Sequence, residues 1–373
     1  MVQPYKICTN CIMDTTDPDI LFDDNGVCSH CHRYESIIQS ESYLKKREDG
    51  ALDCLVAEIK RKGANKKYNC IIGVSGGVDS TYVAYIVKKL GLRPLAVHLD
   101  NGWNSDMAVI NMKKTLEKLD INLYKYDSDC EEFHDLQLAF LKASTPDVEI
   151  PTDHAIAALL YRIAGHENVQ YILCGTNTAT EGGGVPAWSQ GHGDWRYIKS
   201  IYKRFGKGNA LKSFPHYGPF KFVYYTLIKK IKWIPILDYL NYNKKEAMTI
   251  LENELDWKYY GGKHYESIYT RFCQGYILPK KFGFDKRILH LSSLIWSGQL
   301  SRDDAIEEMT KPDYPLELQE QDRMLVEKKL GISHEEFNEL MNYPAKSFWD
   351  FTSYKRIFKN KLFLSVYHAL KRR

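Results

Sequence analysis

Long apolar runs are missing from this chain of 373 residues. No stretch reaches the roughly 18 uninterrupted apolar residues that a membrane-spanning helix needs, and no apolar core follows the N-terminus as in a secretory signal. Internal repeats and low-complexity linkers are also missing. Hydrophobic residues make up 44% and charged residues 26%, which is typical of a globular chain of about two domains. We therefore expect a cytoplasmic globular protein rather than a membrane, fibrous or disordered one.

Acidic residues are missing from one long segment. Between Asp194 and Asp238 the chain has ten basic residues and no acidic one, although its net charge is only +4. The ten are Arg196, Lys199, Lys203, Arg204, Lys207, Lys212, Lys221, Lys229, Lys230 and Lys232. Such a segment attracts anions, so we expect 196–232 to serve an anionic acceptor molecule.

The C-terminal stretch 355–373 is a second basic segment without acid. Apolar residues recur in it every four positions, at Phe358, Leu362, Val366 and Leu370. This pattern predicts a basic amphipathic helix that contacts a membrane surface or a partner, or that packs on the core instead.

Four of the nine cysteines form two Cys-x-x-Cys pairs, separated by sixteen residues. This spacing is typical of a four-thiolate zinc ribbon, and a pair of redox dithiols is the alternative. We predict structural zinc, because a closed four-thiolate site has no open coordination position for catalysis. The predicted ligands are Cys8, Cys11, Cys28 and Cys31.

A serine- and glycine-rich loop, 73–80, directly follows the apolar run Cys70-Ile71-Ile72 and precedes a helical pattern that stops at Gly91. A strand, loop and helix in this order direct backbone N–H groups and the helix dipole at one point, which favours a phosphate. The loop lacks the Gly-Lys-Ser/Thr ending of the nucleoside-triphosphate P-loop. Asp79 is a candidate magnesium ligand, although a carboxylate in a first helical turn also serves the helix dipole alone. The predicted phosphate-binding residues are Ser75, Gly76, Gly77, Val78 and Ser80.

Short apolar runs alternate with helical patterns from residue 68 to 176. This alternation predicts an α/β domain with a parallel sheet and helices on both faces. The predicted strands are Asn69–Val74, Pro94–Leu99, Asn122–Tyr126 and Gln170–Cys174, and the predicted helices are Ser80–Leu90, Asp106–Leu119, Glu131–Ala143 and Asp153–Ala164. Ligands bind beyond the carboxyl ends of such strands. We therefore expect the loops 73–80, 99–103 and 174–183 to converge on one crevice.

Four regions follow from these patterns. They are a zinc ribbon at 1–36, a nucleotide-binding domain at 37–181, a basic insertion or lid at 182–240, and a mostly helical region at 241–373 that completes the active site. In the last region, predicted helices include Asn243–Leu255, Arg302–Met309, Gln319–Lys329 and His334–Met341.

The loop Ser75-Gly76-Gly77-Val78-Asp79-Ser80 resembles the SGGVDS loop of the PP-loop ATP pyrophosphatase superfamily. The resemblance implies a fold like that of the adenine nucleotide alpha hydrolases, with ATP and Mg²⁺ as ligands, cleavage of ATP to AMP and pyrophosphate, and adenylylation of an oxygen. The segment 174–181 resembles the Gly-Thr-Asn…Glu loop of ammonia-using members such as NAD synthetase. That likeness implies phosphate contacts at Gly175 and Thr176 and a magnesium contact at Glu181. Asp100 ends the second strand, where the superfamily binds adenine through backbone groups.

A third block, 257–272, combines a Gly-Gly turn with charged side chains. Lys263 or Arg271 is suited to reach the pyrophosphate while His264 and Glu266 face an acceptor, although a solvated helix start has the same spacing. With the segments 13–20 and 290–295, this block resembles the N-acetyl sugar amidotransferase family typified by WbpG and PseA.

That resemblance implies an amidine-forming reaction on a sugar precursor of bacterial surface glycans such as the lipopolysaccharide O-antigen. The acetamido oxygen of the sugar attacks the α-phosphate of ATP, and ammonia then displaces AMP from the O-adenylyl imidate to leave an acetamidino group. The resemblance also implies separate glutaminase and ammonia-channel subunits similar to imidazole glycerol phosphate synthase. We find no glutaminase-like segment and no nucleophile paired with histidine in this chain.

A zinc-ribbon enzyme that thiolates tRNA is the main alternative, since several of these also join a ribbon to an SGG-type loop. Such enzymes usually need a second reactive cysteine pair, whereas the other cysteines here are isolated in the sequence. A non-enzymatic nucleic-acid binder would leave the phosphate loop unexplained. We therefore predict an ATP-dependent N-acetyl sugar amidotransferase that binds no nucleic acid.

Overall fold

A computed structural model describes residues 4–208, 210–312 and 314–358. At its centre is a five-stranded sheet in the order β3-β2-β1-β4-β5, in which all neighbouring strands are parallel. The strands are β1 (Cys70–Gly73), β2 (Pro94–Asp100), β3 (Asn122–Asp127), β4 (Tyr171–Cys174) and β5 (Lys232–Pro235). The chain builds the sheet outward on one side of β1 and then on the other. The strand order therefore reverses between β1 and β4, the place where parallel sheets bind ligands.

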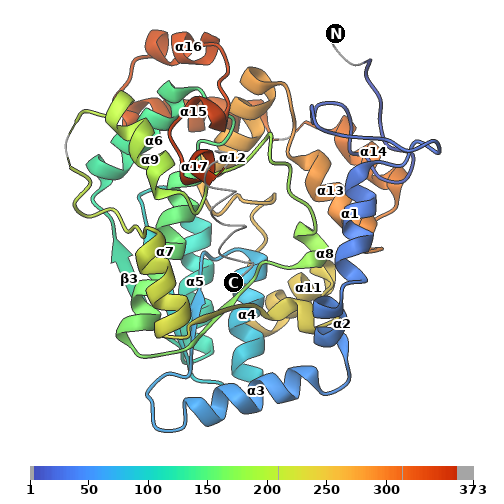
Figure 1. Cartoon of the computed structure of the whole chain (residues 1–373), viewed down its shortest axis with the longest axis vertical. Coiled ribbons are helices and arrows are strands. Elements are labelled where there is room, and N and C mark those ends of the chain that lie inside the picture. Colours follow the sequence, from blue (N-terminus) through green and yellow to red (C-terminus); the bar gives the residue numbers. More distant parts are fainter. Residues whose placement is uncertain (1–3, 209, 313, 359–373) are drawn as a thin grey trace, which may run out of the picture.

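Helices cover both faces of the sheet, as the alternating pattern predicts (Figure 1). The helices concerned are α3 (Ala51–Lys62), α4 (Val78–Lys89), α5 (Asp106–Lys118), α6 (Cys130–Ala143) and α7 (Ile150–His166). Consecutive residues of a strand point to opposite faces. Accordingly, Ile71 lies in the core beside α6 and α7, whereas Ile72 lies in the core beside α4 and α5.

The structure differs from the sequence prediction at 182–240, where we expect an insertion or lid. Residues 232–235 form β5, which pairs with β4 and extends the sheet beyond residue 181. Helix α9 (Trp195–Phe205) packs on α6 and buries Tyr197, Ile198, Ile201 and Tyr202. A strand of four residues that follows Lys229 and Lys230 gives little sequence signal, and its pairing with β4 decides its conformation. The remaining short elements are α8 (Thr178–Glu181), α10 (Pro219–Val223), the π-helix η1 (Tyr224–Ile228) and the 3₁₀ helix η2 (Ile236–Tyr239).

The chain beyond β5 is mostly helical, as predicted. Its elements are α11 (Lys244–Leu255), α12 (Ile268–Phe272), the π-helix η3 (Cys273–Phe282), α13 (Arg287–Trp296), α14 (Arg302–Thr310), α15 (Leu316–Leu330), α16 (His334–Asn342), the 3₁₀ helix η4 (Phe348–Asp350) and α17 (Tyr354–Phe358). Three of the four residues of the predicted amphipathic tail, Leu362, Val366 and Leu370, lie outside the described residues. Within the described ranges, no helix combines the length and the hydropathy that a bilayer span requires.

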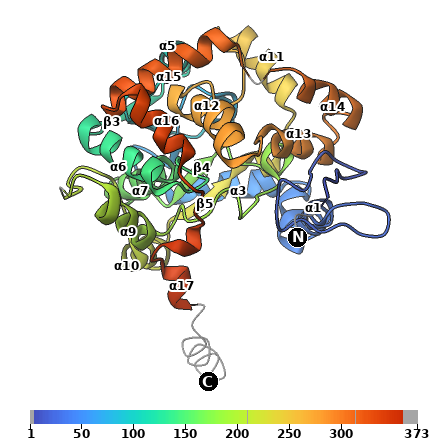
Figure 2. The same cartoon turned by 90° about the horizontal axis from the view of Figure 1, so that it is seen from above.

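The N-terminal ribbon precedes α1 (Ser29–Ile38) and α2 (Glu41–Arg47). Both views place α1 beside α13 and α14, far along the chain (Figures 1 and 2). Buried ribbon residues such as Ile12 and Met13 share one apolar cluster with Leu278 and Ile288 of the C-terminal region. The ribbon therefore packs on α13 and its neighbours in the C-terminal region.

Candidate functional site

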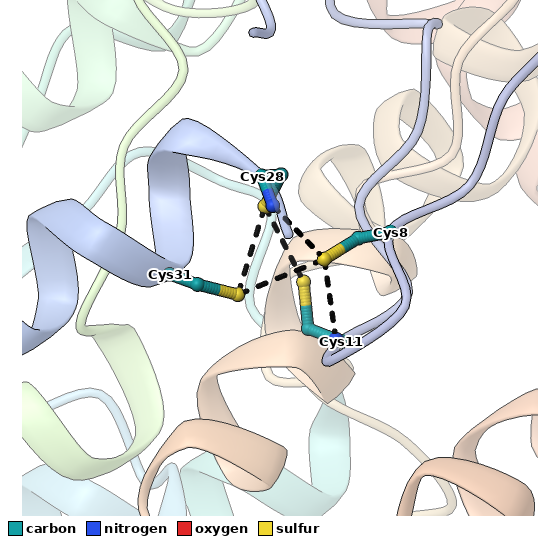
Figure 3. Close-up of side chains that lie close together, drawn as sticks. All are labelled: Cys8, Cys11, Cys28 and Cys31. Atoms are coloured by element: carbon teal, nitrogen blue, oxygen red, sulfur yellow. Dashed lines mark hydrogen bonds between the residues drawn. The ribbon is translucent and has the colours of Figure 1, made fainter. Parts of the chain in front are cut away.

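The four predicted zinc ligands converge (Figure 3). Their sulfur atoms all lie within 4.8 Å of one another, and all four side chains are buried. The Sγ atoms of Cys8 and Cys31 are 3.8 Å apart, and those of Cys11 and Cys28 are 3.6 Å apart. Four converging thiolates are the donor set and arrangement of a tetrahedral zinc site. His30 and His32 instead contact Asp17 and Asp23, so neither competes with the cysteines.

Residues of the C-terminal region support this cluster directly. The indole N–H of Trp296 donates to Cys31 Sγ at 3.2 Å, and the Arg302 guanidinium donates to the carbonyl oxygens of Cys8 and Cys11. Donors of this kind orient thiolates and offset their negative charge. The ribbon is therefore built onto α13 and α14 rather than attached by a free linker.

The phosphate loop joins β1 to α4. The Ser75 N–H donates to Ser80 Oγ at 3.2 Å, and the Gly77 N–H donates to Ser75 Oγ at 3.3 Å. Gly76 has a φ of +82°, and a Cβ there would lie 2.3 Å from the carbonyl oxygen of Ala108. Both the left-handed conformation and the close approach therefore require glycine. The Trp257 indole holds the loop from the other side by donating to the Gly76 carbonyl oxygen at 3.0 Å.

A cavity of about 190 Å³ opens above this loop. It brings together the phosphate loop, the loop after β4 and the block around residue 263, which lie far apart in the sequence. Predicted residues that line it are Ser75, Gly77, Val78, Asp79, Ser80, Gly175, Thr176, Glu181, Lys263, His264 and Glu266. The expected crevice is present at the carboxyl ends of β1 and β4, but the third loop expected there, 99–103, does not line it.

Carboxylates and lysines oppose one another in this cavity. Burial raises the pKa of the Asp79 carboxyl, and the nearby Glu181 carboxylate raises this pKa further. Lys263 Nζ lies 3.4 Å from Glu181 Oε1. Two carboxylates that face one phosphate-sized space suit a magnesium ion that also binds phosphate oxygens.

Two side chains of the site were not singled out by the sequence. Tyr242 donates its hydroxyl proton to Asp79 Oδ1, and Lys244 lines the cavity from the first turn of α11. Burial lowers the pKa of Lys244, opposed by the charge of Asp79. Neither residue belongs to a recognisable motif, and only the position of α11 beside α4 reveals them.

His264 and Glu266 form the remaining wall. His264 Nδ1 lies 3.5 Å from Glu266 Oε1, and a Cβ built at Gly77 would lie 3.2 Å from that same oxygen. Burial alone would raise the pKa of Glu266, but contact with His264 keeps it lowered. An ionised carboxylate therefore sits directly against the phosphate loop, beside an imidazole that is suited to move protons.

Three predicted residues do not line this cavity. Arg271 instead makes a two-pronged ion pair with Asp322, at 2.5 and 2.7 Å. The Asp100 carboxylate accepts from Lys125 at 2.9 Å and from the Gly102 N–H at 3.0 Å, at the end of β2. Gly76 lies on the side of the loop that packs against Ala108. Sequence patterns do not show that Asp322 pairs with Arg271 or that Lys125 pairs with Asp100.

A second cavity of about 210 Å³ adjoins the first and shares Lys244, Tyr259, Gly262 and Lys263 with it. Its other polar and charged lining residues are Thr180, Tyr265, Arg271, Gln274, Asp285, Lys286, Arg287, His290 and Glu308. Lys286 makes no ion pair with any described residue, whereas Arg287 pairs with Asp285 at 2.7 Å. The charge of Lys286 nevertheless acts on the carboxyls of Asp147, Glu149 and Asp153 to lower the pKa of each, so these groups offset part of the positive charge at the second cavity. None of the ten basic residues of 196–232 lines either cavity, contrary to our expectation for that segment.

Two family models match this chain. Residues 50–211 match the NAD synthase family, and residues 266–364 match the C-terminal domain of the WbpG-like LPS biosynthesis proteins. The fold and the first cavity thus define an ATP-utilising PP-loop domain. With the second match, the chain is similar to WbpG-like proteins of the PP-loop superfamily, and these findings support an ATP-using C–N ligase.

Individual relatives are more distant. An uncharacterized protein of Methanocaldococcus jannaschii is 24% identical over 324 residues, which cover 84% of this chain and 96% of that protein. The tRNA(Ile)-lysidine synthase of Chlamydia pneumoniae is 38% identical over 73 residues, or 20% of this chain and 21% of that enzyme.

Solved structures give weak likenesses. The NH3-dependent NAD synthetase of Campylobacter jejuni is 15% identical, with a TM-score of 0.29 over 57% of this chain and 93% of that one. The NMN synthetase of Francisella tularensis is 17% identical, with a TM-score of 0.33 over 79% of this chain and 96% of that one. The likeness to these two families rests on the two family models.

Proposed function

We propose that this protein is an ATP-dependent amidotransferase that converts the N-acetyl group of a sugar precursor into an acetamidino group. The observation that supports this most directly is the first cavity, where the PP loop, Glu181 and the 262–266 block face one another. Its neighbour offers room for an acceptor beside the phosphates.

The PP loop and Lys263 are proposed to bind the pyrophosphate portion of ATP. Asp79 and Glu181 would hold Mg²⁺, which when bound offsets the charge of the leaving pyrophosphate. Lys244 would place a further positive charge beside the phosphates. Held in this way, the α-phosphorus faces the shared wall of the two cavities.

The acceptor is proposed to bind in the second cavity with its acetamido oxygen directed at that phosphorus. Attack forms the oxygen–phosphorus bond of an O-adenylyl imidate, expels pyrophosphate and releases the amide proton, for which Glu266 through His264 is the candidate acceptor. Ammonia then adds to the imidate carbon, and cleavage of its bond to oxygen releases AMP. The products are the amidine, AMP and pyrophosphate.

Product analysis tests this proposal. The purified protein, ATP, Mg²⁺ and ammonium are incubated with a panel of N-acetyl sugars that are neutral, phosphorylated, nucleotide-linked or carboxylated. We expect AMP and pyrophosphate in equal amounts and an amidine product with at least one acceptor. ADP as the product, or AMP release that depends on tRNA instead of a sugar, would contradict the proposal.

Ammonia is proposed to come from separate glutaminase and channel subunits. Ammonium salts should therefore support turnover by the isolated protein, whereas glutamine should do so only when such subunits are added. Efficient use of glutamine by this chain alone would show that it carries a glutaminase site of its own.

A further inference from the structure

An apolar stripe on the 219–228 helical segment faces away from the protein. Phe220, Val223, Tyr224, Leu227 and Ile228 follow the spacing i, i+3, i+4, i+7 and i+8, which normally marks the buried face of a helix. Here all five are exposed, and Phe220 is 93%, Leu227 68% and Ile228 69% exposed. Exposed apolar residues gathered in this way mark a surface that binds something else.

The opposite face of the same segment packs on α7. The ring of Tyr225 stacks on Tyr161 with centroids 5.8 Å apart, and a Cβ built at Gly165 would lie 2.9 Å from the Tyr225 ring. Phe222 also contacts Tyr161 edge-on at 5.8 Å. The segment is therefore anchored with its apolar stripe outward.

Positive charge surrounds the stripe. Lys221 and Lys230 are exposed, Lys229 is half-buried, and no acidic residue occurs between 195 and 237. A second copy of the chain is a poor occupant, because a two-fold interface would bring the same lysines together. An apolar stripe with a basic border matches the boundary between the headgroups and acyl chains of an anionic bilayer.

The end of the described chain points to the same place. Tyr354 and Lys355 line one cavity together with Tyr217, Pro219 and Phe222, and α10 and α17 lie side by side (Figure 2). The following fifteen residues, 359–373, carry Lys359, Lys361, Lys371, Arg372 and Arg373 and no acid. The described chain thus ends near the start of the 219–228 segment, and the sequence that follows carries further positive charge.

We propose that the 219–228 segment is a peripheral membrane-binding element that inserts its apolar stripe into an anionic lipid surface. The neighbouring lysines contact lipid phosphates, and the protein lies on the bilayer without crossing it. This proposal is independent of the amidotransferase reaction, since the stripe lines neither of the two cavities at the PP loop.

Vesicle flotation with the full-length protein tests it. We expect binding to phosphatidylcholine vesicles that contain phosphatidylglycerol, weak binding to phosphatidylcholine alone, and a loss of binding as salt is raised. Leu227→Ser with Ile228→Ser should weaken binding roughly tenfold or more. Charge reversal at Lys229 and Lys230 should weaken it by roughly fivefold or more for each position.

Leu316→Ser is the matched control, because Leu316 on α15 is 77% exposed and belongs to no such stripe. Its vesicle binding should equal that of the unaltered protein. Three results would overturn the proposal. The first is that the protein does not bind anionic vesicles. The second is that binding survives the Leu227/Ile228 change but is lost when the charges of Lys371, Arg372 and Arg373 are reversed. The third is that the protein self-associates in sedimentation and that the Leu227/Ile228 change abolishes this self-association.

Discussion

Tyr242 donates a hydrogen bond from its hydroxyl to the Asp79 carboxylate, joining the segment before α11 to the first turn of α4. Burial and Glu181 raise the pKa of Asp79, and this hydrogen bond opposes them. The hydroxyl thus favours the ionised carboxylate in a cavity that disfavours it.

Tyr242→Phe should therefore raise the pKa of Asp79 further. A larger fraction of Asp79 is then protonated at low pH, so the acid limb of the pH–rate profile moves to higher pH and more magnesium is needed for half-maximal rate. AMP release measured against pH at limiting Mg²⁺ checks this. Tyr85→Phe is the control, because it removes a 2.7 Å hydrogen bond to Glu254 outside the cavity. Identical profiles for Tyr242→Phe and the unaltered protein would contradict the prediction.

Gly76→Ala should abolish ATP turnover, because its Cβ would lie 2.3 Å from the Ala108 carbonyl oxygen and the loop would have to move. Gly208→Ala separates this effect from backbone strain. Gly208 has the same φ of +82°, but a Cβ there meets nothing within 4 Å. Steady-state kinetics and thermal unfolding of both variants should show a loss of activity in the first and only a small loss of stability in the second. Near-normal turnover by Gly76→Ala would contradict the steric argument.

Lys286→Gln should raise the KM of an anionic acceptor roughly tenfold while it changes the KM of ATP little, because Lys286 lines only the second cavity. The comparison variant neutralises Arg196, Lys199, Lys203 and Arg204 together, which removes more charge but none from either cavity. We expect it to leave both KM values near normal. A larger rise of the acceptor KM in the quadruple variant than in Lys286→Gln would indicate that the acceptor binds at the 196–232 segment. An unchanged acceptor KM in Lys286→Gln would exclude an ionic contact at this lysine.

Elemental analysis of the unaltered protein should find about one zinc per chain. Cys28→Ser should remove this zinc and lower the unfolding temperature by roughly 5 °C or more. The ribbon supports α13, and His290 and Leu294 of α13 line the second cavity. We therefore expect the KM of the acceptor to rise before that of ATP does. Cys54→Ser, at an exposed and isolated cysteine, should change neither zinc content nor stability. A metal-free Cys28→Ser protein of full stability would contradict a structural role for the zinc.

The raised pKa of Glu149 should make the free energy of unfolding depend on pH. Burial raises the pKa of the Glu149 carboxyl to about 8 from its ordinary value of 4.5. Between these two values the folded protein binds more protons than the unfolded chain, so the free energy of unfolding falls as pH rises through that window. Glu149→Gln removes this titration and should increase stability at pH 8.5 relative to the unaltered protein, with little change at pH 5. Denaturant unfolding at the two pH values measures the difference, and parallel pH curves for both proteins would contradict it.

The parts of the site that the sequence predicts are those whose chemistry lies in short, contiguous motifs. The two Cys-x-x-Cys pairs, the Ser75–Ser80 loop and the Lys263–Glu266 block each have a spacing that works locally, and the fold only brings them together. The parallel direction of the strands follows from the alternation of apolar runs with helical patterns, whereas their order in the sheet does not. Both kinds of information are read along the sequence without any knowledge of tertiary contacts.

Tertiary contacts account for what the sequence does not predict. Tyr242, Lys244 and Trp257 act on the PP loop only because α11 packs beside α4, with no periodic signal of their own. Arg271 looks available in the sequence, but Asp322 lies more than fifty positions along the chain and occupies its guanidinium. β5 is too short for a recognisable pattern and exists because the edge of β4 is open to it.

The contact between the ribbon and α13 affects the order in which this chain matures. All four cysteines lie within the first 31 residues, so the ribbon can bind metal while most of the chain is still being synthesised. Its docking partner arrives late, because the Ile12 N–H meets Ser292 Oγ at a separation of 280 residues. Lys263, His264 and Glu266 also follow the PP loop by more than 180 residues. A ribosome-bound nascent chain therefore carries a finished metal module and a phosphate loop, but no enclosed active site, until its last third emerges.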